Sequence, residues 1–351
     1  MRTLAFIALL PLTALADTAN TTARTLNTLG DGIWEIRHPD APDGFPQGNT
    51  TVIAGDKAVL VVDSCLLPSS AKQDIEQIRK WTQKPVTWLV NTHWHFDHTA
   101  GNAAYADAFP GLQIVAHEHT KKMIESFNPG AIARYPGRQQ RFEQMLQMGK
   151  DQDGKPLTDA VRADLKKSLA GLASVVAEMK GLVQLVPNVV FEHELRLDLG
   201  NREVQILFLG RGNTAGDTIV YLPREKLVVA GDLLDHPIPY FFGGFPVDLV
   251  ATLRRVSEME IETIVPGHGE VLRGKGYVTR VASLVAAVNA EVEKELNAGV
   301  TKDQIPETAL KNLPVASWRG QFAGTDKDNG DWFDQSFGGL LKAASNQISI
   351  R

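Results

Sequence analysis

Short apolar runs recur along the whole chain and are separated by polar turns that contain glycine, proline, asparagine or aspartate. Runs of this length, rich in Val, Ile and Leu, are typical of strands buried in a β-sheet. Residues 50–54 and 58–62 flank a Gly55-Asp56 turn and therefore predict a hairpin. The predicted strands are 50–54, 58–62, 85–90, 113–116, 189–191, 204–209, 218–222, 227–230 and 263–265.

Apolar residues spaced three and four apart predict helices between these strands. The clearest stripe consists of Val161, Leu165, Leu169, Leu172, Val176 and Met179. Thr158 precedes it and is predicted to cap the helix. The composition of residues about 128–181 changes to Arg, Gln, Lys and Met with Pro-Gly and Asp-Gly breaks, so this region is predicted to be an inserted helical hairpin. Packing into the core is favoured for its apolar face, with a lid or a dimer surface as the alternatives.

Other segments carry weaker signals. Ser70 and Gln73 form a capping-box pattern that predicts the start of a helix, and Asp248 is predicted to cap another. Residues 40–48 are rich in proline and glycine and predict a loop. Residues 291–351 are less regular, and we expect a packed C-terminal extension with helical and irregular parts.

The first residues have the pattern of a secretory signal. Arg2, an apolar stretch at 4–12 and Ala14-Leu15-Ala16 predict a signal peptide over residues 1–16 with cleavage after Ala16. The apolar stretch is shorter than the roughly 20 residues that a membrane-spanning helix needs. We therefore expect a secreted or periplasmic protein without a stable membrane span.

Composition limits the possible partners. The 351 residues include 36 basic and 41 acidic side chains, a net charge of −5. This balance argues against a nucleic-acid partner, which draws on clustered Lys and Arg. Cys65 is the single cysteine, so no intramolecular disulfide forms and stability must come from the apolar core. We expect a small-molecule substrate; the sequence leaves the oligomeric state open.

One hexapeptide concentrates the chemistry. His93-Trp94-His95-Phe96-Asp97-His98 places three imidazoles and one carboxylate directly after the predicted strand at 85–90. Neutral imidazole and ionised carboxylate are preferred ligands of Zn²⁺ and related metals. Alternate residues leaving a strand project the same way, so His93 and His95 can share one ion. Asp97 and His98 then face a second position.

Three later strands are also followed by polar candidates. The strand at 204–209 leads into Gly210-Arg211-Gly212-Asn213-Thr214, the strand at 227–230 into Gly231-Asp232, and the strand at 263–265 into Pro266-Gly267-His268-Gly269. Functional residues commonly lie on loops at the edge of a rigid sheet. Four strand ends that supply polar groups in series therefore suggest one cleft.

The hexapeptide, the glycine-flanked turn, Gly231-Asp232 and Pro266-Gly267-His268-Gly269 together resemble the ordered signature of the metallo-β-lactamase superfamily, over residues about 27–290. The resemblance implies an α+β fold, a four-layer αββα sandwich with a metal cleft at one edge. Carried over by residue, it implies a first metal position at His93 and His95, a second at Asp97, His98 and His268, and a carboxylate bridge at Asp232.

One position departs from the pattern of the family. The third histidine of the first position is expected in the turn that here reads Gly212-Asn213-Thr214. An asparagine offers a neutral amide oxygen, which is a poor ligand for Zn²⁺ beside imidazole. Asn213 is therefore a weak ligand or none. Either the first position keeps His93, His95 and Asp232 with lower affinity, or only the second position is filled, so we expect one or two Zn²⁺ per chain, with iron and manganese as alternatives.

Further polar and aromatic residues are weaker candidates. Arg211, His236 and Phe45 are candidate substrate contacts, and Asp217 is interpreted as the cap of its own turn. The histidines that lack a partner at another strand end are interpreted as structural; these are His38, His117, His119 and His193.

The predicted chemistry is hydrolysis by metal-bound hydroxide. A metal with an open position lowers the pKa of bound water from about 16 to about 7 and polarises a carbonyl. The candidate substrates are an amide, lactam, lactone or ester, including a β-lactam. Asp97 is expected to orient the water; with only the second position filled, His93 or His95 becomes the general base. The alternative is a metal-binding or iron–oxygen redox protein without hydrolytic turnover.

Overall fold

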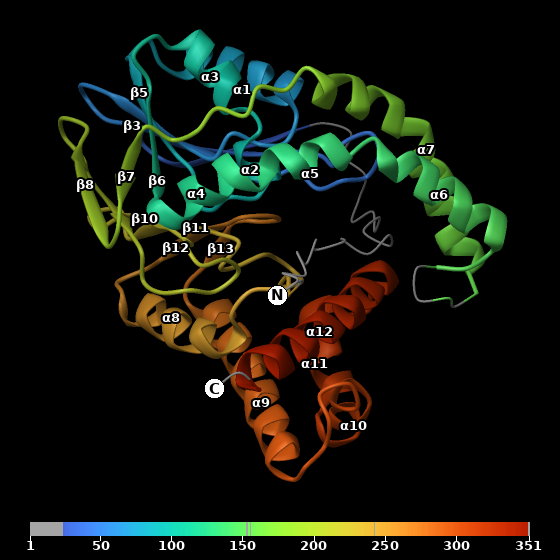
Figure 1. Cartoon of the computed structure of the whole chain (residues 1–351). Coiled ribbons are helices and arrows are strands. Elements are labelled where there is room, and N and C mark those ends of the chain that lie inside the picture. Colours follow the sequence, from blue (N-terminus) through green and yellow to red (C-terminus); the bar gives the residue numbers. More distant parts are fainter. Residues whose placement is uncertain (1–23, 152–153, 155, 242, 350–351) are drawn as a thin grey trace.

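Two β-sheets lie face to face between outer layers of helices (Figure 1). The computed structural model describes residues 24–349 apart from 152–153, 155 and 242, so the predicted signal peptide at 1–16 lies outside the described residues. The α+β four-layer sandwich expected from the sequence is confirmed.

The first sheet contains seven strands in the order of the sequence. β1 to β4 pair antiparallel, whereas β4 to β7 pair in parallel. The strands are β1 (Thr25–Gly30), β2 (Ile33–Arg37), β3 (Thr50–Ala54), β4 (Val59–Val62), β5 (Val86–Val90), β6 (Gln113–His117) and β7 (Val189–Phe191).

The second sheet contains six strands in the order β13-β12-β11-β10-β9-β8. Only β11 and β12 pair in parallel. Its strands are β8 (Glu194–Asp198), β9 (Glu203–Leu207), β10 (Ile219–Leu222), β11 (Leu227–Gly231), β12 (Thr263–Pro266) and β13 (Leu272–Arg273).

Strand β4 explains why the layers stack, because successive side chains of a strand point to opposite faces. Leu60 and Val62 face the second sheet, and Val59 and Val61 pack under the helices of the outer layer. The side chains of β11 also alternate between the two faces of their sheet, and Val229 faces the first sheet. Strands buried on both faces read as continuous apolar runs, and each such side chain contributes about 1.5–3 kcal/mol when fully buried.

The helices divide between the two outer surfaces. Figure 1 shows α1 and α3 over the first sheet and α8 with α9 against the second. The first set is α1 (Pro68–Trp81), α2 (Phe96–Thr99), α3 (Asn102–Ala108), α4 (Glu118–Ser126), α5 (Asn128–Arg134), α6 (Gly137–Met148) and α7 (Asp159–Lys180). The second set is α8 (Pro246–Glu258), α9 (Gly276–Asn297), α10 (Ile305–Asn312), α11 (Val315–Ala323) and α12 (Lys327–Ile348).

The region predicted as an insertion folds into α5, α6 and α7, at the right of Figure 1. Thr158 caps α7 as predicted, because its side chain accepts a hydrogen bond from the amide of Val161 at 3.2 Å. Leu172 and Met179 on α7 are buried against residues of the 40–48 loop, including Phe45. The insertion therefore supports the loop that adjoins the predicted metal ligands.

The C-terminal extension is helical. α12 packs against α9 and α8, and its residues Phe333, Phe337 and Leu340 join the core under the second sheet. α9 continues across residue 290, the boundary drawn from the sequence. Among the helices that the structure describes, none combines the length and the apolar character needed to cross a bilayer.

Two predicted helix starts are wrong. α1 begins at Pro68, so Ser70 lies inside its first turn and caps nothing. α8 begins at Pro246, so Asp248 likewise lies in the first turn. Proline is well suited to the first helical position, because its fixed φ fits the helix and its missing N–H would have no partner there. In both helices the proline therefore defines the start.

Candidate metal centre

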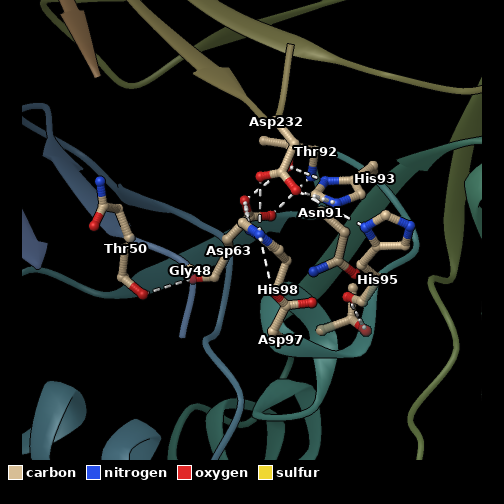
Figure 2. A network of polar contacts seen from close by, with 12 residues as sticks. Gly48, Thr50, Asp63, Asn91, Thr92, His93, His95, Asp97, His98 and Asp232 are labelled. Atoms are coloured by element: carbon tan, nitrogen blue, oxygen red, sulfur yellow. Dashed lines mark hydrogen bonds and ion pairs between the residues drawn. The ribbon is translucent and has the colours of Figure 1, made fainter. Parts of the chain in front are cut away.

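The predicted ligands meet at the edge where the two sheets face each other. The parallel pairs β4–β5 and β11–β12 bring carboxyl ends of strands to this edge. Figure 2 shows Asp232 reaching the histidines of the hexapeptide from the opposite sheet. The side chains brought together are His93, His95, Asp97, His98, Asp232 and His268.

The second position is the more enclosed. The Nε2 atoms of His98 and His268 lie 3.1 Å apart. Asp97 Oδ2 is 3.3 Å from His268 Nε2, and Asp232 Oδ1 is 3.0 Å from His98 Nε2. All four residues are buried. Donor atoms this close together can share one metal ion.

The first position is more open. His93 Nε2 lies 3.2 Å and His95 Nδ1 lies 3.8 Å from Asp232 Oδ2. The side chain of His95 is 30% exposed, whereas that of His93 is 1% exposed. Asn213 donates from Nδ2 to Asp232 Oδ2 at 3.3 Å. Asn213 is thus a hydrogen-bond donor to the bridging carboxylate, where the resemblance leads one to expect a third imidazole.

Asp63 is a further candidate for the site, not predicted from the sequence. Its carboxylate accepts hydrogen bonds from His98 Nδ1 at 2.9 Å, Thr92 Oγ1 at 2.7 Å and the Thr92 amide at 2.8 Å. Asp63 has φ of +60°, a strained conformation for this residue type that is often retained at functional sites. The sequence does contain a hint of this role, because Asp63 directly follows the apolar run of β4, as other candidate ligands follow strands.

The hydrogen bonds of Asp63 determine which ring nitrogens can bind a metal. Because His98 Nδ1 donates to Asp63, His98 Nε2 keeps its lone pair toward the centre. Thr92 Oγ1 gives its proton to Asp63 and so accepts from His93 Nδ1 at 3.1 Å. His93 Nε2 therefore also presents a lone pair. One carboxylate orients a histidine of each position, as second-sphere carboxylates do in metal sites.

Two close contacts test whether a metal fits. Buried His93 Nε2 lies 3.2 Å from Asp232 Oδ2 and buried Asp232 Oδ1 lies 3.0 Å from His98 Nε2, but neither His93 Nε2 nor Asp232 Oδ1 makes a hydrogen bond of good geometry within the described part of the chain. Buried polar atoms crowded together without such hydrogen bonds are costly unless a cation or a proton lies between them. Imidazole nitrogen and carboxylate oxygen are also the donors that divalent zinc, iron and manganese accept. The residues present therefore fit a divalent ion.

Glycine and asparagine keep the backbone close to the ligands. A Cβ on Gly48 would lie 2.4 Å from the ring of His98, and one on Gly267 would lie 2.0 Å from Asp232 Oδ1. Asn49, also missed, donates to the carbonyls of Pro266 and Gly269 at 3.1 and 3.0 Å. These contacts join the 40–48 loop to the turn that carries His268.

The electric field at the centre favours positive charge. Burial works against a charge on His98, yet Asp232, Asp97 and Asp63 raise its pKa well above the ordinary value. Burial also opposes the charged form of Asp97, but the neighbouring His98 and His268 lower its pKa to about 2. The same field that would hold a proton here attracts a metal cation.

The three candidate substrate contacts lie outside the ligand cluster. Arg211 forms an ion pair with Asp248 at 2.6 Å and stacks 4.2 Å from the ring of Phe245. The ring of His236 packs 5.2 Å from that of Tyr277. Phe45 is buried against Phe96 and Tyr135. Each of these side chains is already engaged in packing or pairing.

Among the residues interpreted as structural, His117 and Asp217 have partners in the surrounding backbone and turns. His117 accepts from the amide of His119 at the start of α4 and contacts the carbonyl of Glu192. Asp217 accepts from the amide and hydroxyl of Thr214, so it caps the turn, and burial raises its pKa to about 7. Burial also raises the pKa of the Cys65 thiol to about 12, which makes it an inert core residue.

The chain thus has an αββα sandwich with a cluster of histidine and aspartate side chains at one edge of its sheets. The chain belongs to the metallo-beta-lactamase superfamily, because the sequence model of that family matches residues 43–268. The resemblance seen in the sequence is thus confirmed at the level of the family.

The similarity to relatives covers only part of this chain and about half of each relative. The linear primary-alkylsulfatase of Pseudomonas sp. (strain ATCC 19151) is 23% identical over 73% of this chain and 48% of its own length. The 2,4-dinitroanisole O-demethylase subunit alpha of Nocardioides sp. (strain JS1661) is 38% identical over 62% of this chain and 52% of its own. The chain spans about half the length of these relatives.

A solved structure extends the likeness in fold to most of the chain. The stereoselective inverting sec-alkylsulfatase Pisa1 from Pseudomonas sp. matches with a TM-score of 0.63 and 15% identity, covering 92% of this chain and 50% of that protein. At this identity the match concerns the fold. It includes most of the chain beyond the segment matched by the family model.

Proposed function

We propose that this chain is a metal-dependent hydrolase of small organic molecules, exported through the segment at residues 1–16. The observation that carries the proposal is the convergence of six imidazole and carboxylate side chains on one largely buried centre. Membership of the superfamily and hydrolytic relatives support the same reaction class. We propose Zn²⁺ as the first metal to test.

A divalent ion at this centre would lower the pKa of a water molecule and polarise the bond under attack. Asp97 belongs to the second position, where its carboxylate can orient the water. His95 is the exposed imidazole and faces the side from which a substrate can enter. His93 is enclosed and hydrogen-bonded, so His95 is the better general base if the first position carries no metal.

Aromatic side chains flank this open side. The ring of Trp94 lies 4.4 Å from that of His95 and 4.9 Å from that of Phe127. Such a wall suits an apolar substrate group beside the polar reacting centre. We propose esters, lactones, amides and β-lactams with an apolar substituent as substrates. The names of the relatives add alkyl sulfates and methoxyarenes to the compounds worth testing.

The test begins with the purified mature protein. Metal is removed with a chelator, Zn²⁺, Mn²⁺ or Fe²⁺ is restored, and hydrolysis of an aryl ester, a lactone, a β-lactam and an alkyl sulfate is measured. We expect metal-dependent turnover of at least one compound. Asp232→Ala removes an oxygen from both metal positions, and we expect kcat/KM to fall by about 10³-fold.

Asp107→Ala is the matched control, because Asp107 is an exposed aspartate on α3 in the outer helix layer. It should keep the activity of the natural chain. Unchanged turnover in folded Asp232→Ala, or no turnover with any of the three metals, would contradict the proposed function.

A further inference from the structure

Asp235 is a buried carboxylate beside the metal centre to which neither the sequence nor the family resemblance gave a role. Its side chain is 1% exposed. Neither carboxylate oxygen makes a hydrogen bond of good geometry within the described residues. An isolated buried carboxylate is among the most costly groups in a protein interior. Asp235 therefore needs a proton or a cation beside it.

The backbone holds Asp235 in place from several sides. Gly267 donates to the carbonyl of Leu234 at 3.0 Å, and His236 donates to the carbonyl of His268 at 3.1 Å. The hydroxyl of Tyr277 on α9 donates to the carbonyl of Asp235. Leu233 and Leu234, directly before it, are buried in the core. The position of this carboxylate is therefore set by the fold, and it moves little without disturbing the turn that carries His268.

Asp235 points to the second metal position. One carboxylate oxygen of Asp235, one of Asp232 and one ring nitrogen of His268 all lie within 4.8 Å of one another. Asp232 and His268 also belong to the second position with Asp97 and His98. Donor atoms bound to one ion at about 2.1 Å lie no more than about 4.2 Å apart. A small shift of the side chains is therefore enough for Asp232, Asp235 and His268 to bind the same ion.

Resting on the metal dependence proposed above, we propose that Asp235 is a further ligand of the second metal position. The position then has three carboxylates and two imidazoles. Carboxylate donors suit harder ions such as Mn²⁺, and imidazole suits zinc and iron. This set therefore favours Mn²⁺ or Fe²⁺ more than a site made of imidazoles does.

The space around Asp235 agrees with this role. A cavity of about 10 Å³ is lined in part by Asn213, Asp232, Asp235 and Tyr240. This is close to the smallest volume that holds a water molecule. One water molecule therefore fits in a cavity that Asn213, Asp232 and Asp235 help to line.

The experiment compares metal binding by the mature chain with that of Asp235→Asn, which keeps the shape of the side chain and removes its charge. Glu35→Gln is the matched control, because Glu35 is a buried carboxylate on β2 that is not among the centre's ligands. Metal-free protein is titrated with Mn²⁺ and with Zn²⁺ by calorimetry, and bound metal is counted by elemental analysis. We expect Asp235→Asn to lose at least about tenfold in affinity for Mn²⁺ at the tighter position, and less for Zn²⁺. Glu35→Gln should bind both ions as the natural chain does.

A crystal structure of the Mn²⁺-loaded natural chain tests the same ligand without a substitution, and remains decisive if Asp235→Asn does not fold. A bond between Mn²⁺ and an Asp235 oxygen supports the assignment. Equal Mn²⁺ affinity in folded Asp235→Asn, or an ion bound without Asp235, overturns it while leaving the proposed hydrolase intact. A natural chain that binds no divalent ion overturns both proposals.

Discussion

The two metal positions share Asp232 but are built differently. The first offers His93 and His95, one of them exposed, and has Asn213 where a third imidazole is expected. The second is enclosed by Asp97, His98 and His268, with Asp235 close by. The second position therefore gathers more metal-binding side chains and more negative charge than the first.

The contrast concerns how buried charge is compensated. Each carboxylate of the second position is buried, and a bound cation offsets the cost of removing it from water. The first position contains only one oxygen of the shared carboxylate and relies on neutral imidazoles. We therefore expect the second position to hold its ion more tightly and to remain filled when metal is scarce.

Among substitutions that test this difference between the two positions, Asp63→Asn is expected to change metal affinity the most. Asp63 fixes His98 directly and His93 through Thr92, so its loss disturbs one ligand of each position. Loss of such an orienting carboxylate typically costs about 10–100-fold in metal affinity. We expect a decrease of this size at the second position and a smaller one at the first, measured by calorimetric titration of metal-free protein.

Thr92→Val is the matched variant for this comparison. It keeps the shape of the side chain and removes the hydroxyl that joins Asp63 to His93. Only the first position should weaken, while the second keeps its affinity. If Thr92→Val weakened both positions equally, the separate routes from Asp63 to the two histidines would be refuted.

A smaller change is expected from Asn213→His, which would add a third imidazole beside the first position. The side chain of Asn213 already lies beside Asp232, at 3.3 Å from Oδ2. An added imidazole is a better zinc ligand than an amide, so affinity at the first position should rise by about tenfold, of the order that single ligand-sphere changes produce. Elemental analysis at limiting Zn²⁺ should then show a higher metal content than in the natural chain. An unchanged content would mean that Asn213 is not what weakens the first position.

Much of the architecture was predictable from the sequence, because strands buried on both faces leave continuous apolar runs. β4, β5, β10, β11 and β12 were predicted to within a residue or two for this reason. β1, β2, β8 and β13 were missed. β1 and β8 alternate between polar and apolar residues and lie largely on the surface, and β13 has two residues, so their pairing partners determine them more than their own composition does.

The candidate ligands were predictable because they are clustered in sequence or follow strands directly. Asp63 follows a strand in the same way, but a single aspartate after an apolar run is too common a signal by itself. The neighbours of Asp235 in the sequence do not mark it as a ligand. Its proposed role follows from its burial and from the turn that holds it beside His268. Compensation of buried charge is a property of the folded chain and cannot be read from neighbouring residues.

Glu35 is a buried carboxylate away from the metal centre that forms no ion pair within the described residues, so it shows what burial alone costs a carboxylate. It lies on β2, fully buried, with one oxygen accepting from Asn27 at 2.6 Å and the other without a hydrogen-bond partner among the described residues. Burial raises its pKa from 4.5 to about 7. The unfolded chain releases this proton at lower pH than the folded chain does, so folding stability decreases as the pH rises from about 4.5 to 7 and then levels off.

Glu35→Gln should remove this decrease, because the amide is neutral at every pH in the range. The natural chain and the variant should have similar thermal midpoints near pH 4.5. Above pH 7 the variant should be more stable by about 2–3 kcal/mol, or several degrees in the midpoint. Scanning calorimetry of metal-free protein from pH 4.5 to 8 measures the difference directly. A constant difference across this range would mean that Glu35 ionises as it does in water, and that burial costs this carboxylate little even without a cation.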